Sequence, residues 1–374
     1  MRGYLIAALV AALLTAGLMP LAIGVGNRFG ILAQPDGERR LHKRPTPLLG
    51  GAAMCIGVIG ALLVAWRIRQ FQDVFASSSE VIGVGIGALI ITAVGLADDL
   101  WEVSPPAKLA GQVLAGSAMY LFGVTLDQVT LPFIGNLQIS ADLTPLITVL
   151  WVIGMGQAIN LIDGLDGLAA GIVAIASAAF LLYSSRLFDS DLISGSNMGP
   201  LVAAITLGVC VGFLPFNFNP ARVFMGDAGA LLLGLLMAAS TVVVGGRAVQ
   251  GVPVPGQTFF FLAPLFIPIL ILAVPIGDVV RLFITRTIRR TGWANAGRDH
   301  LHYRLIELGH GPRRAVVLIW MFTAILSAFA LAPLFFKSAW VFAPLSVGLV
   351  GVSLTAFFHP DLIRRRREAR RERA

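Results

Sequence analysis

The chain has 374 residues, of which 57% are hydrophobic and 13% are charged, and its mean hydropathy is +0.83. Because a soluble domain is about 25% charged, this composition excludes a disordered chain and argues against a soluble enzyme. The two cysteines, Cys55 and Cys210, lie inside apolar runs and give neither a disulfide framework nor a zinc-site spacing. The formal net charge of +8 would suit nucleic acid or anionic lipid, so the positions of the basic residues decide between them.

Apolar runs near the length of about 20 residues that a bilayer demands follow one another along the whole chain. The sequence therefore predicts an all-α polytopic membrane protein with eleven transmembrane helices, in which one membrane domain (1–358) precedes a basic tail (359–374). The predicted spans are 4–24, 49–66, 81–97, 107–124, 143–159, 168–185, 198–216, 228–245, 257–279, 314–334 and 339–358. Between the fourth and fifth spans, residues 125–142 alternate in polarity around a Gly-Asn pair, which predicts a small hairpin.

The basic residues are distributed unequally between the two sides of this topology. If the N-terminus lies outside, the inner segments hold 22 of the 28 Lys and Arg residues and the outer segments hold 6. The positive-inside rule then predicts an outer N-terminus and a cytoplasmic C-terminus. The basic residues line the inner membrane face, so we expect a lipid bilayer and no nucleic acid as the partner. The tail is equally well explained as an anchor to anionic lipid or as a topological stop signal.

Polar side chains gather beside a few of the spans, although acids cost about 2.5–3.5 kcal/mol at the centre of a membrane helix and therefore suggest function. They are Asp98, Asp99, Asn160, Asp163, Asp166, Asn217, Asn219, Asp227, Asp278, His300, His302 and Arg304. All of them fall on the side that the Lys and Arg distribution makes cytoplasmic. This placement predicts a site at one membrane face, whereas a transporter, the other class considered, needs polar groups reachable from both sides.

The acidic residues leave several roles open. Asp98 and Asp99 are adjacent, so their side chains diverge, and one can face a metal while the other caps a helix. Asp227 precedes a predicted span and could either cap it or bind Mg²⁺, which proteins typically hold with one or two carboxylates. Asn160, Asp163 and Asp166 would share one face of a helix. Two glycines, Gly164 and Gly167, interrupt that helix and permit close backbone approach to a ligand; a solvated Gly-rich loop is the alternative.

Cationic and aromatic residues beside these acids suit a phosphorylated ligand. Lys108 could bind a phosphate or simply extend to the membrane surface. His300 and Arg304 lie four residues apart near His302, a pattern that suits a pyrophosphate or a solvated loop; a zinc site would need softer ligands. Phe224 could stack on a base or pack in the core. Basic residues in 39–51 could attract an anionic substrate, although the positive-inside signal explains them equally well.

Five motifs occur in an order that closely resembles the polyprenyl-phosphate N-acetylhexosamine-1-phosphate transferases. They are HKRPTPLLGG, LADDLWEVSPPAKLAGQ, NLIDGLDGLAAG, NFNPARVFMGDAGALLLG and RDHLHYRLIELGH. The resemblance covers about residues 25–315. The expected eleven spans and the HLHYR motif are similar to the WecA type, which loads GlcNAc-1-phosphate onto undecaprenyl phosphate. The related MraY type is expected to have ten spans and three consecutive histidines.

The resemblance implies a reaction in the inner (cytoplasmic) membrane of a bacterium. A UDP-N-acetylhexosamine, UDP-GlcNAc first among them, would give its sugar 1-phosphate to undecaprenyl phosphate or another polyprenyl phosphate, with release of UMP. This would be the first membrane step of a cell-envelope glycan such as the lipopolysaccharide O-antigen. The implied cofactor is Mg²⁺, with Mn²⁺ as the alternative, and a homodimer is left open. Another UDP-N-acetyl sugar remains an alternative donor.

The resemblance also assigns roles to residues. It implies a metal ligand at Asp227, a base, nucleophile or metal ligand at Asp98, and a catalytic carboxylate at Asp99. The nucleotide side would be formed by Asn160, Asp163, Gly164, Asp166, Asn217 and Phe224, and the diphosphate would lie among Lys108, His300, His302 and Arg304. Leu48, Ala230 and Tyr303 depart from the commonest family pattern and leave the sugar in doubt, but no carboxylate is lost. A general base has almost no proton to remove, because the acceptor phosphate, with a second pKa of about 6, is mostly ionised at pH 7.

Overall fold

The computed structural model describes residues 1–34, 45–131, 135–189, 196–245, 301–336 and 339–371, and four single positions between 277 and 287. The described chain is mostly helical. Its helices are α1 (Arg2–Phe29), α2 (Gly50–Ala65), α3 (Gln72–Ser77), α4 (Glu80–Trp101), α5 (Pro105–Leu121), α6 (Thr144–Ile162), α7 (Leu168–Asp189), α8 (Gly199–Asn217), α9 (Gly226–Gly245), α12 (Leu301–Glu307), α13 (Pro312–Phe335) and α14 (Phe342–Arg371), with short 3-10 turns at Arg69–Phe71 and Ala339–Val341.

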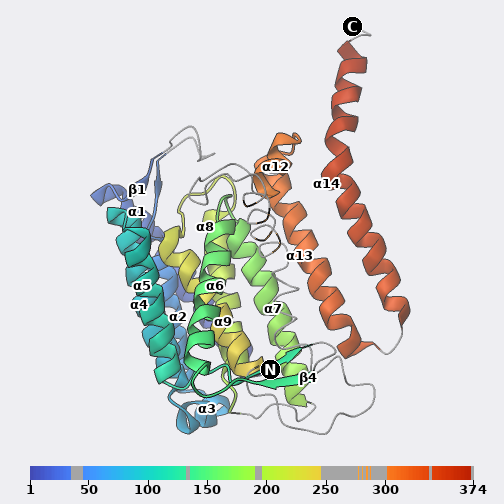
Figure 1. Cartoon of the computed structure of the whole chain (residues 1–374). Helices are drawn as coiled ribbons and strands as arrows, with labels where there is room; N and C mark the ends of the chain where they lie inside the picture. The colour runs from blue at the N-terminus through green and yellow to red at the C-terminus, as the bar shows by residue number, and fades with distance from the viewer. Residues whose placement is uncertain are drawn as a thin grey trace.

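Two short hairpins lie at opposite ends of the bundle (Figure 1). One pairs β1 (Leu32–Ala33) with β2 (Thr46–Pro47), and the other pairs β3 (Gln128–Leu131) with β4 (Gly135–Gln138), both antiparallel. The second hairpin confirms the one predicted from the alternating segment 125–142. The N-terminus lies near the end that carries β3 and β4, whereas α12 and the last turns of α14 lie at the end that carries β1.

The number of spans differs from the expected eleven. Among the described residues, seven helices are long and apolar enough to cross a membrane, and an eighth span results if α2 is joined to Arg69–Ser77, which turns away from it by 92°. Helix α5 has 17 residues, and the apolar part of α14 is Phe342–Ala356. The predicted span 257–279 lies outside the described residues. A multi-pass helical membrane protein is therefore confirmed, and the count of eleven is not.

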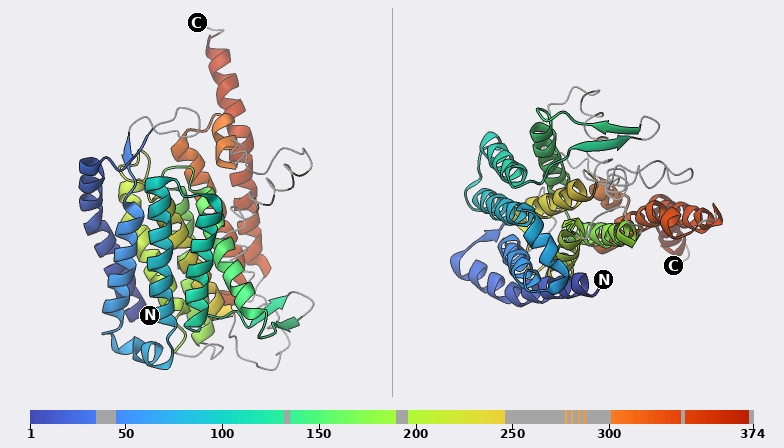
Figure 2. Two further views of the ribbon diagram at one scale, coloured as in Figure 1. Left: turned by 60° about the vertical axis from the view of Figure 1, so that its left-hand side comes forward. Right: turned by 90° about the horizontal axis from the view of Figure 1, so that it is seen from below.

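Helix α9 forms the centre of the bundle, where its apolar stretch is buried all round. It packs against α2, α4, α6, α7 and α8 (Figure 2, right). A Cβ at Gly234 would lie 2.7 Å from the Met155 carbonyl oxygen, so glycine at this position lets α9 and α6 approach closely. The first turn of α9, which carries Asp227, is thus fixed at one end of the core.

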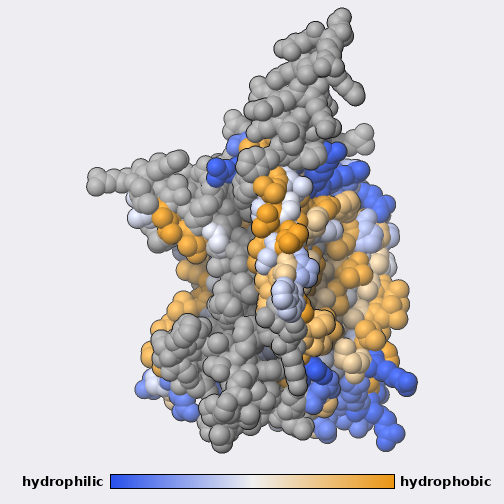
Figure 3. All heavy atoms as spheres, turned by 90° about the vertical axis from the view of Figure 1, so that its right-hand side faces the viewer, coloured by the Kyte–Doolittle hydropathy of each residue, from blue (hydrophilic) through white to orange (hydrophobic). Residues whose placement is uncertain are grey.

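The outer surface is apolar between hydrophilic ends. Large hydrophobic side chains are exposed on many helices, among them Leu13 on α1, Ile56 on α2, Leu114 on α5 and Leu150 on α6. Figure 3 shows hydrophobic residues across the middle of one face and hydrophilic residues gathered above and below them. Such a large apolar surface is typical of helices that face lipid.

Candidate active site

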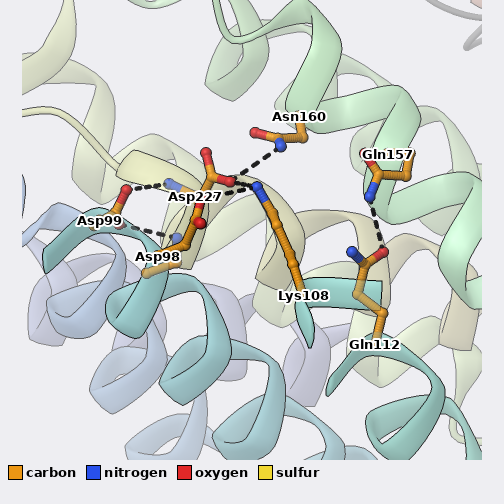
Figure 4. Close-up of polar contacts among 8 residues, drawn as sticks. Asp98, Asp99, Lys108, Gln112, Gln157, Asn160 and Asp227 are labelled. Atoms are coloured by element: carbon orange, nitrogen blue, oxygen red, sulfur yellow. Dashed lines mark hydrogen bonds and ion pairs between the residues drawn. The ribbon is translucent and has the colours of Figure 1, made fainter. Parts of the chain in front are cut away.

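Four helix ends bring together an ionic cluster. Asp98 lies in the last turn of α4, Lys108 in the first turn of α5, Asn160 in the last turn of α6 and Asp227 in the first turn of α9. The Lys108 Nζ lies 3.0 Å from the Asp98 Oδ2 and also forms an ion pair with the Asp227 Oδ2, to which the Asn160 Nδ2 donates a hydrogen bond of 3.3 Å (Figure 4). The three charged side chains are 17–25% exposed, so the cluster is half-buried yet reachable from outside the core.

The two adjacent aspartates have different partners. The Asp99 carboxylate accepts hydrogen bonds from the backbone N–H groups of Asp227, at 2.9 Å, and Ala228, at 3.2 Å. It therefore caps the N-terminus of α9, where a negative charge is stabilising. Asp227 does not cap its own helix through its side chain; instead its carboxylate faces Lys108 and Asn160. Asp98 thus joins the ionic cluster, whereas Asp99 holds the helix that carries Asp227.

A backbone clamp holds the loop that leads to Asp227. The Phe224 N–H donates to the Pro47 carbonyl at 2.8 Å, and the N–H groups of Gly50 and Gly51 donate to the carbonyls of Phe224 and Met225 at 3.0 Å each. A Cβ at Gly51 would lie 2.6 Å from the Met225 carbonyl oxygen, so only glycine permits this approach. From the sequence, Gly50 and Gly51 are expected only to open the next span, and their contact with the loop before Asp227 is not predicted.

Gly226 completes this arrangement. Its φ of +62° lies in the left-handed region, which favours glycine. A Cβ there would lie 2.8 Å from one carboxylate oxygen of Asp99 and closer still to the other. The glycine before Asp227 therefore both turns the chain into α9 and leaves room for the carboxylate that caps it.

The NLIDGLDG segment does not form the continuous helix face that its spacing suggested. Helix α6 ends at Ile162, so only Asn160 of the three polar residues is helical, and the turn at Gly164 redirects the chain. Asp166 Oδ2 accepts hydrogen bonds from the Asn219 side chain at 2.8 Å and from the Ala221 N–H at 3.0 Å. The prediction of a shared helix face was wrong, because α6 ends at Ile162, before either acid of the segment.

Asn217 bridges the same two loops from the end of α8. Its Oδ1 accepts a hydrogen bond from the Gly167 N–H at 2.8 Å, its Nδ2 donates to the Val223 carbonyl at 3.0 Å, and the residue is 2% exposed. These contacts join the loop after α6 to the loop before α9. The nucleotide role expected for Asp166 and Asn217 stays a prediction, and the contacts show that both side chains hold the site's loops in place.

Asp163, which follows α6, has a perturbed protonation equilibrium. Burial, followed by the neighbouring negative charges of Asp99 and Asp166, raises its pKa from the ordinary 3.8 to about 7. Each of these influences disfavours the ionised form. At neutral pH this carboxyl is therefore poised between its protonated and ionised states.

The remaining predicted residues lie around this centre or outside the described residues. Phe224 is half-buried in the clamped loop, and Arg304 is exposed on α12, which also contains His302. Helix α12 lies at the same end of the bundle as the β1–β2 hairpin, from which the clamp extends. His300 and Asp278 fall outside the described residues.

The cluster suits a hard divalent cation. Asp98 and Asp227 contact the same ammonium group, so their oxygens already converge on one positive charge. Magnesium usually keeps several waters and takes only one or two protein carboxylates beside substrate phosphates. Within the parts of the chain that the structure describes, no group of three or more His, Cys, Asp or Glu residues could hold a metal ion. Two carboxylates match the ligands that magnesium takes beside substrate phosphates, whereas zinc is usually held by cysteine and histidine.

Comparison with known proteins agrees with this geometry. The family described as "Glycosyl transferase family 4" matches residues 81–245, a range that contains Asp98, Lys108, Asn160 and Asp227. The decaprenyl-phosphate N-acetylglucosaminephosphotransferase of Mycobacterium leprae is 34% identical over 344 residues, which cover 90% of this chain and 85% of that protein. The chain belongs to glycosyl transferase family 4. The resemblance drawn from the five motifs is thereby confirmed.

Two less similar relatives match over comparable lengths. The probable undecaprenyl-phosphate N-acetylglucosaminyl 1-phosphate transferase of Bacillus subtilis is 28% identical, with 92% of this chain and 88% of that protein covered. The phospho-N-acetylmuramoyl-pentapeptide-transferase of Mycobacterium bovis is 29% identical, with 92% and 99% covered. The chain is thus a membrane transferase, and the transporter alternative is set aside.

Proposed function

We propose that this chain transfers N-acetylglucosamine 1-phosphate from UDP-GlcNAc to a polyprenyl phosphate and releases UMP, at the cytoplasmic face of a bacterial inner membrane. The observation that supports this most directly is the Asp98–Lys108–Asp227 cluster at the ends of three helices. Relatives that match most of the chain are named for decaprenyl phosphate or undecaprenyl phosphate and for N-acetylglucosamine. Undecaprenyl phosphate or another polyprenyl phosphate is the proposed acceptor, and a homodimer is left open.

The chemical obstacle in this reaction is charge. A phosphate dianion must approach a pyrophosphate, and in phosphoryl transfer the protein contributes mainly by positioning and by neutralising charge. Asp98 and Asp227 would hold Mg²⁺, which would neutralise part of the diphosphate charge when bound. Lys108 supplies a fixed positive charge beside them for a phosphate oxygen, and the Asn160 amide keeps the Asp227 carboxylate turned toward it.

Asp98 is proposed as an anchor and not as a general base. Its carboxylate is paired with Lys108 at 3.0 Å, and a phosphate monoester with a second pKa of about 6 has little proton to lose at pH 7. Asp99 is proposed to position the helix that carries Asp227, because both of its carboxylate oxygens accept hydrogen bonds from backbone N–H groups of α9. The chemistry therefore depends on how the four helix ends are held relative to one another.

The test uses purified full-length protein in detergent with Mg²⁺ and a panel of UDP-sugars, with undecaprenyl phosphate and decaprenyl phosphate as acceptors. We expect UMP release with UDP-GlcNAc only when acceptor and metal are both present, and loss of that release in Asp227→Asn. Gly154→Ala is the matched control, because an added methyl there meets nothing within 4 Å. Absence of UMP from every UDP-sugar, with wild-type protein that is folded, would reject the proposal.

A further inference from the structure

A pair of amide side chains lies one helical turn inside the bundle from the ionic cluster. Gln112 follows Lys108 by four residues on α5, and Gln157 precedes Asn160 by three residues on α6, so each shares a helix face with a cluster residue. The Gln157 Nε2 donates a hydrogen bond of 3.1 Å to the Gln112 Oε1 (Figure 4). Because Lys108 begins α5 and Asn160 ends α6, the amide pair lies about 6 Å deeper along the bundle.

The amide nitrogen of Gln112 donates no hydrogen bond to any described residue. Gln112 is 1% exposed, and its Nε2 has no hydrogen-bond partner among the residues that the structure describes. A glutamine amide carries two N–H donors, and buried donors are rarely left without an acceptor. In Figure 4 this nitrogen is turned toward the side of the pair where Lys108 lies. In the pair Gln112 only accepts, so both N–H donors of its amide are unused within the described part of the chain, and a pair that served only to join α5 to α6 would not need them.

The position of this donor relative to the membrane identifies a fitting acceptor. A polyprenyl phosphate carries its phosphate on a hydrocarbon chain, so it reaches the cluster from the bilayer side, whereas a nucleotide sugar arrives from water. Gln112 lies about one helical turn further into the bundle than Lys108, which is the side from which such a phosphate would meet the cluster. A phosphate monoester offers strong acceptor oxygens, and bonds from N–H donors to ionised groups are among the stronger hydrogen bonds.

We propose that the Gln112 amide donates a hydrogen bond to the phosphate of the lipid acceptor, while Gln157 holds that amide in the required orientation. This inference rests on the proposed function and adds a recognition group for the acceptor monophosphate. Lys108 and Gln112 would then contact the same phosphate from successive turns of α5. The nucleotide sugar would not contact Gln112.

The test measures equilibrium binding to purified full-length protein of three probes: undecaprenyl phosphate, its uncharged alcohol undecaprenol, and UMP. Gln112→Leu is expected to weaken binding of undecaprenyl phosphate about tenfold and to leave undecaprenol and UMP unchanged. Gln157→Leu is the matched control, since it removes the same bridge but keeps the Gln112 donor, and it is expected to have a smaller effect. Tenfold corresponds to about 1.4 kcal/mol.

Gln112→Glu provides a second variant. It keeps an oxygen to accept from Gln157 but replaces the donor with a carboxylate, so it should weaken phosphate binding more than Gln112→Leu does. Equal losses for all probes in both leucine variants, or wild-type affinity in Gln112→Glu, would show that the pair only joins two helices. A wild-type protein that does not prefer undecaprenyl phosphate to undecaprenol would also overturn the inference. Preferred binding without UMP release from any UDP-sugar would instead reject the proposed reaction alone.

Discussion

Replacing Gly51 with alanine tests whether the backbone clamp controls the position of Asp227. The new methyl group would lie 2.6 Å from the Met225 carbonyl oxygen and 2.7 Å from the Ala228 carbonyl carbon, whereas ordinary contact begins at 3.4 Å. Both neighbours are backbone atoms and cannot rotate away. Helix α2 and the start of α9 must therefore separate by about 1 Å, and a misplacement of about 1 Å can reduce turnover about 100-fold.

The assay is the rate of UMP release under saturating UDP-GlcNAc and acceptor, together with the thermal stability of the purified protein. Overpacking of this kind typically costs about 1–3 kcal/mol of stability, so Gly51→Ala should melt earlier and turn over about 100-fold more slowly. Gly154→Ala on α6 makes the same substitution with nothing within 4 Å of the new methyl and should retain activity. Turnover of Gly51→Ala within threefold of wild type would refute the link between the clamp and the site.

Three further substitutions separate the roles of the acids. Asp99→Asn removes one acceptor and the charge from the α9 cap, so it should cost about 1–2 kcal/mol of stability in a thermal melt; an unchanged melt would contradict the capping role. Asp98→Asn should lower turnover by the same factor at pH 6 and pH 9, because Asp98 removes no proton. A loss of turnover at only one of these pH values would support a general-base role for Asp98. The pKa of Asp163 is raised from 3.8 to about 7 in the folded protein. Between these pH values the folded state binds more protons than the unfolded state, so the stability of the protein falls as the pH rises through this window. Asp163→Asn should abolish that fall and raise the melting temperature at pH 8 by roughly 2–4 °C, with little change at pH 4; equal pH dependence in both proteins would contradict the shift.

The location of the site could be predicted from sequence because two independent patterns agreed. Lys and Arg counts assigned the inner face, and the acids and amides fell on that same face. The structure gathers Asp98, Lys108, Asn160 and Asp227 at the ends of four helices, and the hairpin of β3 and β4 was also foreseen. Both results follow from local patterns, namely the cost of charge in apolar spans and the turn chemistry of Gly-Asn.

The separate roles of the residues within the site could not be predicted, because they depend on contacts between segments that are distant in the sequence. Adjacent Asp98 and Asp99 have the same chemistry, and only the approach of α9 gives Asp99 two backbone N–H groups to accept. In the sequence Gly51 is one of many glycines near the start of a predicted helix. Only the structure shows that its backbone N–H donates to the Met225 carbonyl and so holds the loop before Asp227. Gln112 shows no signal until α6 brings Gln157 to it.

The count of eleven spans is not confirmed by the described residues. Hydropathy recognises apolar runs, but α5 has 17 residues and the apolar part of α14 is Phe342–Ala356, so neither is among the seven described helices that are long enough to cross a membrane. Helix α2 bends by 92° into the segment Arg69–Ser77. Apolar composition thus identifies helices that enter the membrane more reliably than it gives their number.

The central claim is that the group transferred is a sugar 1-phosphate, and the most direct measurement follows the phosphorus atom. Wild-type protein is supplied with undecaprenyl phosphate, Mg²⁺ and UDP-GlcNAc labelled with ³²P at the β position. The account predicts that the label moves into the lipid product while unlabelled UMP is released, and that Asp227→Asn abolishes the transfer. Label that stays with the nucleotide as UDP while the sugar alone reaches the lipid would contradict the account.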